Sequence, residues 1–315
     1  MKGIIEKITR PSRKWTDQLL IAGVLSVVLM VGGMGVADTA FKKLGLQGRL
    51  ESFFGSDNLA AFFLEYLTFI GIWIIAFLFI AIPKGNRPML KAWGYNREGN
   101  NLKGILVGAL LGFATNGFCV LMSVLMGDIK LSFNGFKPII LLIFLAVVFI
   151  QSGAEEITDR LYFYQKLRRR YKSPWVAILA NSIVFMVLHM PNPGFTAIAG
   201  CQIVLVGIIF SVMVYYYNSL WAAMWFHTLW NYTQNIIFGL PNSGRVSDYS
   251  IFKLEAASAN SGFFYDTAFG VEGSIGASVV LAVVLLILLL INRGKGEKRD
   301  YWKDIAAEAG YESKH

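Results

Sequence analysis

The stretch PIILLIFLAVVFIQSGAEEITDRLYFYQKLRRR, residues 138–170, decides the fold of this chain. It opens with an apolar run that is slightly shorter than the roughly 20 residues needed to cross the hydrocarbon core of a bilayer. Glu155 and Glu156 follow this run directly, and the helical pattern then continues to Arg170. Ionisable groups inside a membrane-spanning segment are costly, so each one marks a candidate functional site. The stretch therefore predicts a membrane helix that carries polar chemistry.

The composition of the chain is that of a membrane protein. Of its 315 residues, 55% are hydrophobic and 16% are charged, and the mean hydropathy is +0.53. A soluble domain would carry about a quarter charged residues. The apolar stretches that are long enough, or nearly so, to span a bilayer are residues 18–38, 59–82, 104–126, 138–154, 174–190, 196–217, 219–239 and 273–292. We predict an all-α polytopic membrane protein with about eight transmembrane helices, and we expect the candidate functional site inside the helix bundle.

Residues 1–292 are expected to form a single transmembrane domain, with its catalytic core at about 138–240, and residues 293–315 a polar tail. The first apolar run is longer than the roughly 7–15 residues of a secretory signal, so we expect an uncleaved anchor. Cys119 and Cys201 both fall within spans and give no basis for a disulfide framework or a Cys-based zinc site. They are expected to pack as small apolar residues.

The distribution of basic residues predicts the orientation in the membrane. With eight spans, both ends of the chain lie on one side, and the segments on that side hold 22 of the 29 lysines and arginines. These basic segments are 1–17, 83–103, 160–173 and 293–315, and the segments on the other side are 39–58, 127–137 and 240–272. By the positive-inside rule, both termini are cytoplasmic, in a plasma membrane. The net charge of +9 matches anionic lipid, and nucleic acid is not expected as a partner because the basic residues are spread over several membrane-flanking loops.

Short polar patterns lie in three of the apolar segments. They are Glu155-Glu156-x-x-x-Arg160, Phe185-x-x-x-His189 and His227-x-x-x-Asn231. Glu156 and Arg160 are four residues apart with the acid first, the better orientation for an ion pair on one helix face. His227 and Asn231 also share a face, where an imidazole and an amide can both donate hydrogen bonds to one oxyanion. The third histidine, His315, is the last residue.

Residues 171–174 break the helical pattern and predict a turn between two antiparallel helices. Glu155 lies 17 residues before Lys172 and His189 lies 17 residues after it. At 1.5 Å per residue, both are about 25 Å from the turn and therefore at one height on neighbouring helices. His227 falls at a compatible depth on its own helix. These groups are expected around one water molecule, in a cavity that opens laterally or toward the cytoplasm.

In this order, and within polytopic spans, the patterns resemble the signature of the CAAX-protease and bacteriocin-processing (CPBP) family of intramembrane endopeptidases. The resemblance covers about residues 138–240. It implies a protease without a metal cofactor, in which Glu155 and His189 activate the water. The implied oxyanion hole is formed by His227 and Asn231.

The resemblance also implies that Glu156 and Arg160 help to build the site. One departure from the family pattern follows the two acids. Asp159 and Leu161 stand where the family often has an aromatic residue before the arginine and a glycine after it. Asp159 is four residues from Glu155, a spacing at which like charges repel each other on a helix.

Other interpretations of these residues stay open. A zinc ion held by Glu155, His189 and His227 with a water molecule would also make a hydrolase. A proton-coupled transporter could use the acids and histidines as a proton relay, although such proteins usually show an internal repeat and the sequence contains none. A catalytically inactive scaffold or regulator of the same fold would tend to lose motif residues, and all are present here. The run Arg168-Arg169-Arg170 is interpreted as an ordinary cytoplasmic flank.

The expected partners are a peptide or membrane-protein substrate and the lipid bilayer. Eight spans indicate a bacterial plasma membrane, with an archaeal one as the alternative, and prenylated CAAX substrates are not expected in bacteria. The resemblance implies processing of a peptide or pro-peptide, in bacteriocin maturation, self-immunity or the export of a signalling peptide.

The orientation is tested by cysteine labelling in intact cells. Arg169 and the tail are expected on the cytoplasmic side, and Lys43 and Lys253 on the outer side. A membrane-impermeant thiol reagent should therefore label cysteines placed at Lys43 and Lys253 but not one placed in the tail. Labelling of the tail cysteine would overturn the orientation.

Overall fold

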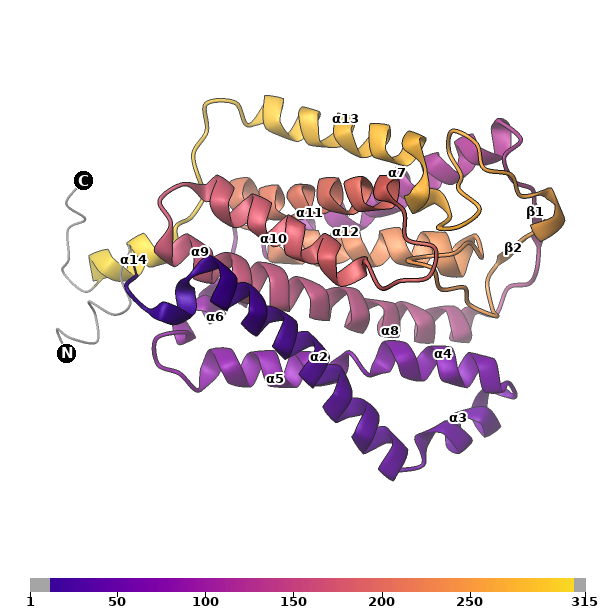
Figure 1. Cartoon of the computed structure of the whole chain (residues 1–315), viewed down its shortest axis with the longest axis horizontal. Coiled ribbons are helices and arrows are strands. Elements are labelled where there is room, and N and C mark those ends of the chain that lie inside the picture. Colours follow the sequence, from indigo (N-terminus) through magenta and orange to yellow (C-terminus); the bar gives the residue numbers. More distant parts are fainter. Residues whose placement is uncertain (1–11, 309–315) are drawn as a thin grey trace.

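The computed structural model describes residues 12–308, so His315 lies outside the described part of the chain. The structure is 70% helical, and its long helices run side by side along the longest axis of the molecule (Figure 1). The predicted all-α polytopic fold is confirmed. Between residues 12 and 308, five helical segments are long and apolar enough to cross a membrane, and two shorter apolar helices accompany them.

Each of the eight predicted apolar stretches forms one helix or begins a run of two or three consecutive helical elements. The long ones are α2 (Leu19–Lys43), α4 (Asp57–Leu67) with α5 (Ile70–Ala81), α7 (Leu102–Leu125), α8 (Pro138–Glu156) with η3 (Ile157–Phe163) and α9 (Tyr164–Arg170), and α11 (Ala197–Tyr217). The shorter ones are α10 (Pro174–His189), α12 (Leu220–Tyr232) with η4 (Thr233–Ile237), and α13 (Ile275–Ile291).

Small elements cap the two ends of the bundle. One end carries η1 (Trp15–Asp17), η2 (Arg87–Met89), α6 (Leu90–Trp93) and α14 (Tyr301–Glu308), and we call it the basic end (Figure 1). The opposite end carries α3 (Leu46–Phe54), η5 (Ala256–Ser258), η6 (Val271–Gly273) and the antiparallel strands β1 (Leu131–Phe133) and β2 (Phe252–Leu254). Among the described residues, 12–17, 83–103, 164–173 and 293–308 belong to segments that the charge distribution assigns to one side of the membrane, and they gather at the basic end.

The helix that carries the two acids is continuous from Pro138 to Arg170 but widens directly after them. Residues Ile157–Phe163 form the π-helical turn η3. A widened turn frees backbone carbonyl groups, which need donors from elsewhere. Thr158 Oγ1 donates to the Glu155 carbonyl over 3.0 Å, and the Asn181 amide on α10 donates to the Asp159 carbonyl. The widened turn is therefore supported by side chains and lies beside the candidate site.

Close contact with α7 fixes the position of α12, which carries His227. A Cβ atom on Gly108 would overlap the carbonyl oxygen of Ala222, and one on Gly112 would overlap that of Phe226. Only glycine allows the two backbones to approach this closely, a common device in membrane helix pairs. Small residues on α7 thus set the depth of α12 inside the bundle.

The structure corrects the interpretation of Arg168-Arg169-Arg170 as an ordinary flank. Arg168 and Arg169 are buried. Arg169 pairs with Asp17 over 2.5 Å and lies above the ring of the buried Trp302, with its guanidinium carbon 4.8 Å from the ring centroid. Arg168 pairs with Glu297, also over 2.5 Å. Acids from segments before α2 and before α14 neutralise the end of α9, because both segments fold back over it.

Candidate active site

The three polar patterns meet inside the bundle. Glu155 and Glu156 end α8, and Arg160 follows in η3. His189 is the last residue of α10, and His227 lies on α12. All five side chains are at most 9% exposed. Helices that are distant in sequence thus bring two carboxyl groups, a guanidinium and two imidazoles together in one buried region.

Glu156 is the centre of a buried ion cluster. Its Oε1 accepts a hydrogen bond from Arg160 Nη1 over 3.1 Å and one from His227 Nδ1 over 3.0 Å. The first bond is the ion pair within one helix that the spacing predicts, and the second joins α8 to α12. A carboxylate can only accept, so Nδ1 of His227 carries a proton.

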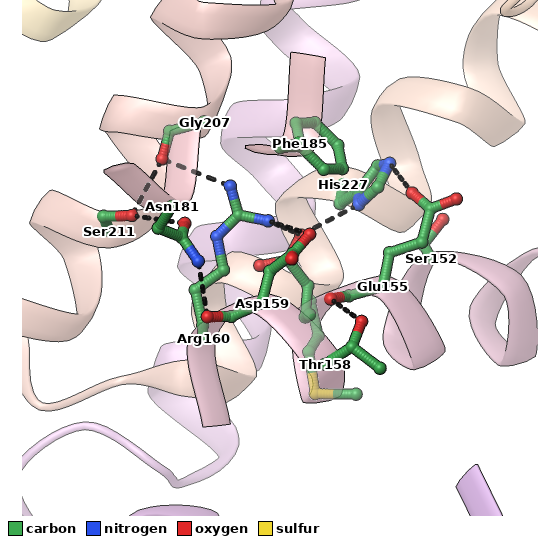
Figure 2. Close-up of polar contacts among 12 residues, drawn as sticks. Ser152, Glu155, Thr158, Asp159, Arg160, Asn181, Phe185, Gly207, Ser211 and His227 are labelled. Carbon is green, nitrogen blue, oxygen red and sulfur yellow. Dashed lines mark hydrogen bonds and ion pairs between the residues drawn. The ribbon is translucent and has the colours of Figure 1, made fainter. Parts of the chain in front are cut away.

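The Arg160 guanidinium is held from several sides. It lies over the Phe185 ring at 4.7 Å and over the Phe210 ring at 5.3 Å, both measured from its central carbon to the ring centroid. Its Nη2 donates to the Gly207 carbonyl over 3.3 Å, as Figure 2 shows. Arg160 therefore joins α10 and α11 to the acidic end of α8, and cation–π contacts of this kind contribute more when they are desolvated.

His227 lies between the two glutamates. Its Nδ1 is bound to Glu156, while its Nε2 faces Glu155 Oε2 at 3.6 Å (Figure 2). The ring stacks on Phe210, with the centroids 5.2 Å apart. Among the described residues, Glu155 Oε2 has no hydrogen-bond partner. The imidazole can therefore exchange a proton with Glu155 or donate to a group that enters between them.

His189 is fixed by its own helix. Its Nδ1 lies 2.8 Å from the Phe185 carbonyl, which can only accept, so Nδ1 carries a proton, and in the neutral ring Nε2 keeps its lone pair. His189 and Glu155 line one cavity of about 310 Å³. His189 also borders a smaller cavity of about 20 Å³, together with His227 and Asn231. The smaller space suits a single water molecule.

The larger cavity opens away from the basic end. Its wall includes Val31 on α2, which is exposed, and the ion pair between Glu65 and Arg245, whose side chains are 41% and 55% exposed. The mouth thus lies between the helices and toward the end that carries β1 and β2. Of the two expected openings, the lateral one fits the lining. The basic end is closed because large buried side chains such as Tyr162 and Trp302 fill it.

Asn231 is brought to the site, but its amide contacts residues that the sequence patterns did not single out. Its Nδ2 donates to Gln151 Oε1 over 3.1 Å and to Ser152 Oγ over 3.3 Å. Gln151 Nε2 in turn donates to Glu155 Oε1 over 2.8 Å. Gln151 precedes Glu155 by four residues, about one helical turn, and this spacing in the sequence could have indicated that the two side chains interact. Asn242, which donates to Asn231 Oδ1 over 3.1 Å, has no such signal.

Asp159, the departure from the family pattern, is buried beside Arg160. Its Oδ2 lies 3.6 Å from Arg160 Nη1, and within the described part of the chain neither carboxyl oxygen has a hydrogen-bond donor. Arg160 is thus the ion-pair partner of both Glu156 and Asp159, while Glu155 faces His227.

The described residues also bear on the zinc alternative. Between residues 12 and 308, no group of three or more His, Cys, Asp or Glu side chains is arranged to hold a metal ion. Instead, His227 Nδ1 is bound to Glu156 and His189 Nδ1 faces a carbonyl group.

Comparison with known families identifies the segment that carries this site. Residues 137–233 match the model of the family described as type II CAAX prenyl endopeptidase Rce1-like. The resemblance seen in the three patterns is confirmed over this segment. The matched family is described as an endopeptidase family, so the match supports a CAAX-type intramembrane endopeptidase and hence a hydrolase. No curated protein matches the chain.

A further acid, Glu272 in η6, borders the smaller cavity from outside the spans. Burial raises the pKa of Glu272 to about 7 from its ordinary value of 4.5, while hydrogen bonds from Ser243 and Trp230 lower it. A raised pKa in the folded state means that the contribution of this group to stability is fully present below about pH 4.5 and is lost as the pH rises to about 7.

As the pH is raised from about 4.5 to 7, we therefore expect the thermal midpoint of the wild type in detergent to fall relative to the midpoint of Glu272→Gln. Above about pH 7 the difference should be constant. The two midpoints are measured over this range by intrinsic fluorescence. Parallel curves for the two proteins would show that Glu272 does not titrate in this way.

Proposed function

We propose that the chain hydrolyses peptide bonds within the membrane, using Glu155 and His189 to activate water. The observation that carries this proposal is the position of His227 between Glu155 and Glu156, at the wall of a cavity that Glu155 shares with His189. A buried carboxylate next to an open cavity is placed to take a proton from water. The lone pair on His189 Nε2 can hold the same water molecule.

In the proposed reaction, the water oxygen attacks the carbonyl carbon of the substrate and its proton passes to Glu155. The carbonyl oxygen becomes an oxyanion. As the C–N bond breaks, the proton on Glu155 moves to the leaving amine. The carboxylate is thereby restored, and no proton is left over.

The proposed oxyanion hole is formed by His227 and Asn231. Because Nδ1 of His227 donates to Glu156, the ring donates to the oxyanion from Nε2 when both of its nitrogens carry a proton. Asn231 makes its longer hydrogen bond, 3.3 Å, to Ser152. A substrate carbonyl oxygen would replace Ser152 as the acceptor. Donors of this kind, placed in advance, stabilise the developing charge.

We propose a peptide or membrane-protein substrate that approaches from the bilayer, and both chain termini in the cytoplasm of a bacterial cell. The lateral mouth of the larger cavity supports the first point. The gathering of the basic segments at one end of the bundle supports the second. The processing of a bacteriocin or signalling peptide is the substrate class that we propose. An inactive scaffold of the same fold is the alternative that the next experiment excludes.

Glu155→Gln should lower hydrolysis by about 10²–10⁴-fold, because the amide keeps the shape but cannot accept the proton. Asn231→Ala should cost about 10²–10³-fold through the lost oxyanion donor, with KM little changed. Glu156→Gln should cost less than Glu155→Gln, since its amide oxygen can still accept from His227 and Arg160.

The measurement uses purified protein in liposomes with a library of internally quenched transmembrane peptides, and the variants are assayed on the peptide that the wild type cleaves fastest. Wild-type activity in Glu155→Gln, or a wild-type protein that cleaves none of the peptides, would refute the protease function and favour the scaffold.

We also propose that hydrolysis needs no metal ion, because a carboxylate and an imidazole suffice to position and deprotonate the water. Treatment of the purified protein with a chelator should leave the rate of peptide cleavage unchanged. Loss of activity on chelation, with recovery on adding zinc, would show instead that the two imidazoles and Glu155 bind a catalytic metal.

A further inference from the structure

A chain of side-chain amides connects the buried acid Glu272 to the proposed base Glu155. Asn242 Nδ2 donates to Glu272 Oε1 and to Asn231 Oδ1, each over 3.1 Å. Asn231 Nδ2 then donates to Gln151 Oε1 over 3.1 Å, and Gln151 Nε2 donates to Glu155 Oε1 over 2.8 Å. Each amide thus donates to the next group in the direction of Glu155.

The two carboxylates determine the direction of this chain. An amide has a donor end and an acceptor end, whereas an ionised carboxylate can only accept. In its ionised form, above a pH of about 7, Glu272 therefore turns the NH₂ group of Asn242 toward itself, and the second hydrogen of that group meets the oxygen of Asn231. The NH₂ group of Asn231 must then point the other way, toward Gln151. Glu155 requires the same orientation of Gln151 from the opposite end.

Glu272 is itself held firmly. Its Oε1 also accepts from Trp230 Nε1 on α12 over 3.1 Å, and its Oε2 accepts from the Ser243 backbone N–H over 2.7 Å. Glu272 precedes α13, and the loop with Asn242 and Ser243 follows η4. Both Glu272 and Asn242 lie outside the matched segment 137–233. An element beyond the catalytic core thus reaches the proposed oxyanion donor.

We infer that Glu272 and Asn242 are positioning residues that hold the Asn231 amide with its NH₂ group facing the proposed site. The inference rests on the proposed function, because only that function gives the orientation of the Asn231 amide a role in a reaction. Neither residue needs to touch the substrate. They act on Asn231, and through Gln151 on Glu155, by excluding the flipped arrangement of each amide.

Asn242→Asp reverses the chain with almost no change in shape. The new carboxylate accepts where Asn242 donated, so the Asn231 amide must flip and turn its oxygen toward Gln151 and Ser152. We expect kcat to fall by about 10²–10³-fold, as for the loss of an oxyanion donor, with KM little changed. The variant should also unfold at a lower temperature, because two carboxyl groups then face each other in a buried position.

A second variant separates positioning from stability. In the double variant Asn242→Asp with Glu272→Gln, the amide and the acid exchange places. The NH₂ group introduced by Glu272→Gln can donate to the new carboxylate, but it gives up the hydrogen bond that Glu272 Oε1 accepts from Trp230 Nε1, so the recovery of stability is partial. The thermal midpoint should recover toward that of the wild type. The Asn231 amide still faces an acceptor, so kcat should stay low.

The matched control is Asn134→Asp. Asn134 directly follows β1, at the end opposite the basic end, and its Nδ2 donates to the Ser250 carbonyl over 3.0 Å. Among the described residues, no side-chain hydrogen bond joins Asn134 to the amide chain. This control should lower the thermal midpoint and leave kcat at the wild-type value.

Activity is measured on the quenched peptide that the wild type cleaves fastest, in liposomes, with Glu155→Gln in parallel. Low kcat in both Asn242→Asp and the double variant, with a recovered midpoint in the latter, supports positioning. Recovery of kcat together with the thermal midpoint in the double variant would overturn the positioning role, and so would a wild-type kcat in Asn242→Asp. In either case, an inactive Glu155→Gln would show that the protease function still holds. Wild-type cleavage by Glu155→Gln would instead overturn the protease function and, with it, the inference.

Discussion

The buried contact of Glu156 with Arg160 and His227 is the interaction on which the rest of the structure depends. Charged groups inside a bilayer are costly, and they persist where partners within the protein compensate them. Glu156 and Arg160 are fully buried, and His227 is nearly so. Removing one partner of a buried pair typically costs about 3–5 kcal/mol, because the other charge is left without compensation. The continuous helix of α8 and η3 and the helix α12 are therefore constrained to meet at this point.

The constraint explains why the surrounding packing is so tight. Arg160 can reach both aromatic rings and the Gly207 carbonyl only if α10 and α11 lie against η3. His227 can reach Glu156 only if α12 lies at the right depth, and the glycines Gly108 and Gly112 on α7 allow this. The apolar surface of the bundle places these helices in the bilayer, and the polar contacts select their rotation and height.

Polar contacts also extend from the ion cluster toward the loops that lie opposite the basic end. Hydrogen bonds run from Glu155 through Gln151 and Asn231 to Asn242. Buried polar groups of this kind need partners with good geometry, because an unsatisfied one in a low-dielectric environment is expensive. The proposed site is thus built from two parts, an ionic part on α8 and η3 and an amide part that depends on the loop after η4. The family match covers the first part and ends before that loop.

The sequence by itself determined the features that depend on one helix at a time. Apolar length predicts the eight helical segments, and a spacing of four residues predicts the ion pair of Glu156 with Arg160. The turn near Lys172 and the common height of Glu155 and His189 also follow from a fixed rise per residue. These quantities do not depend on neighbouring helices.

Only the tertiary structure decided which faces meet. The bond of His227 to Glu156 joins residues that are 71 positions apart, and the amides of Gln151 and Asn242 reach Asn231 from two other segments. The burial of Arg169 and the lateral mouth of the larger cavity also depend on how the segments pack against one another. The physical reason is that the rotation and depth of one helix against another depend on side-chain contacts and on local features such as the π-helical turn η3, and the spacing of residues along one helix carries no information on either.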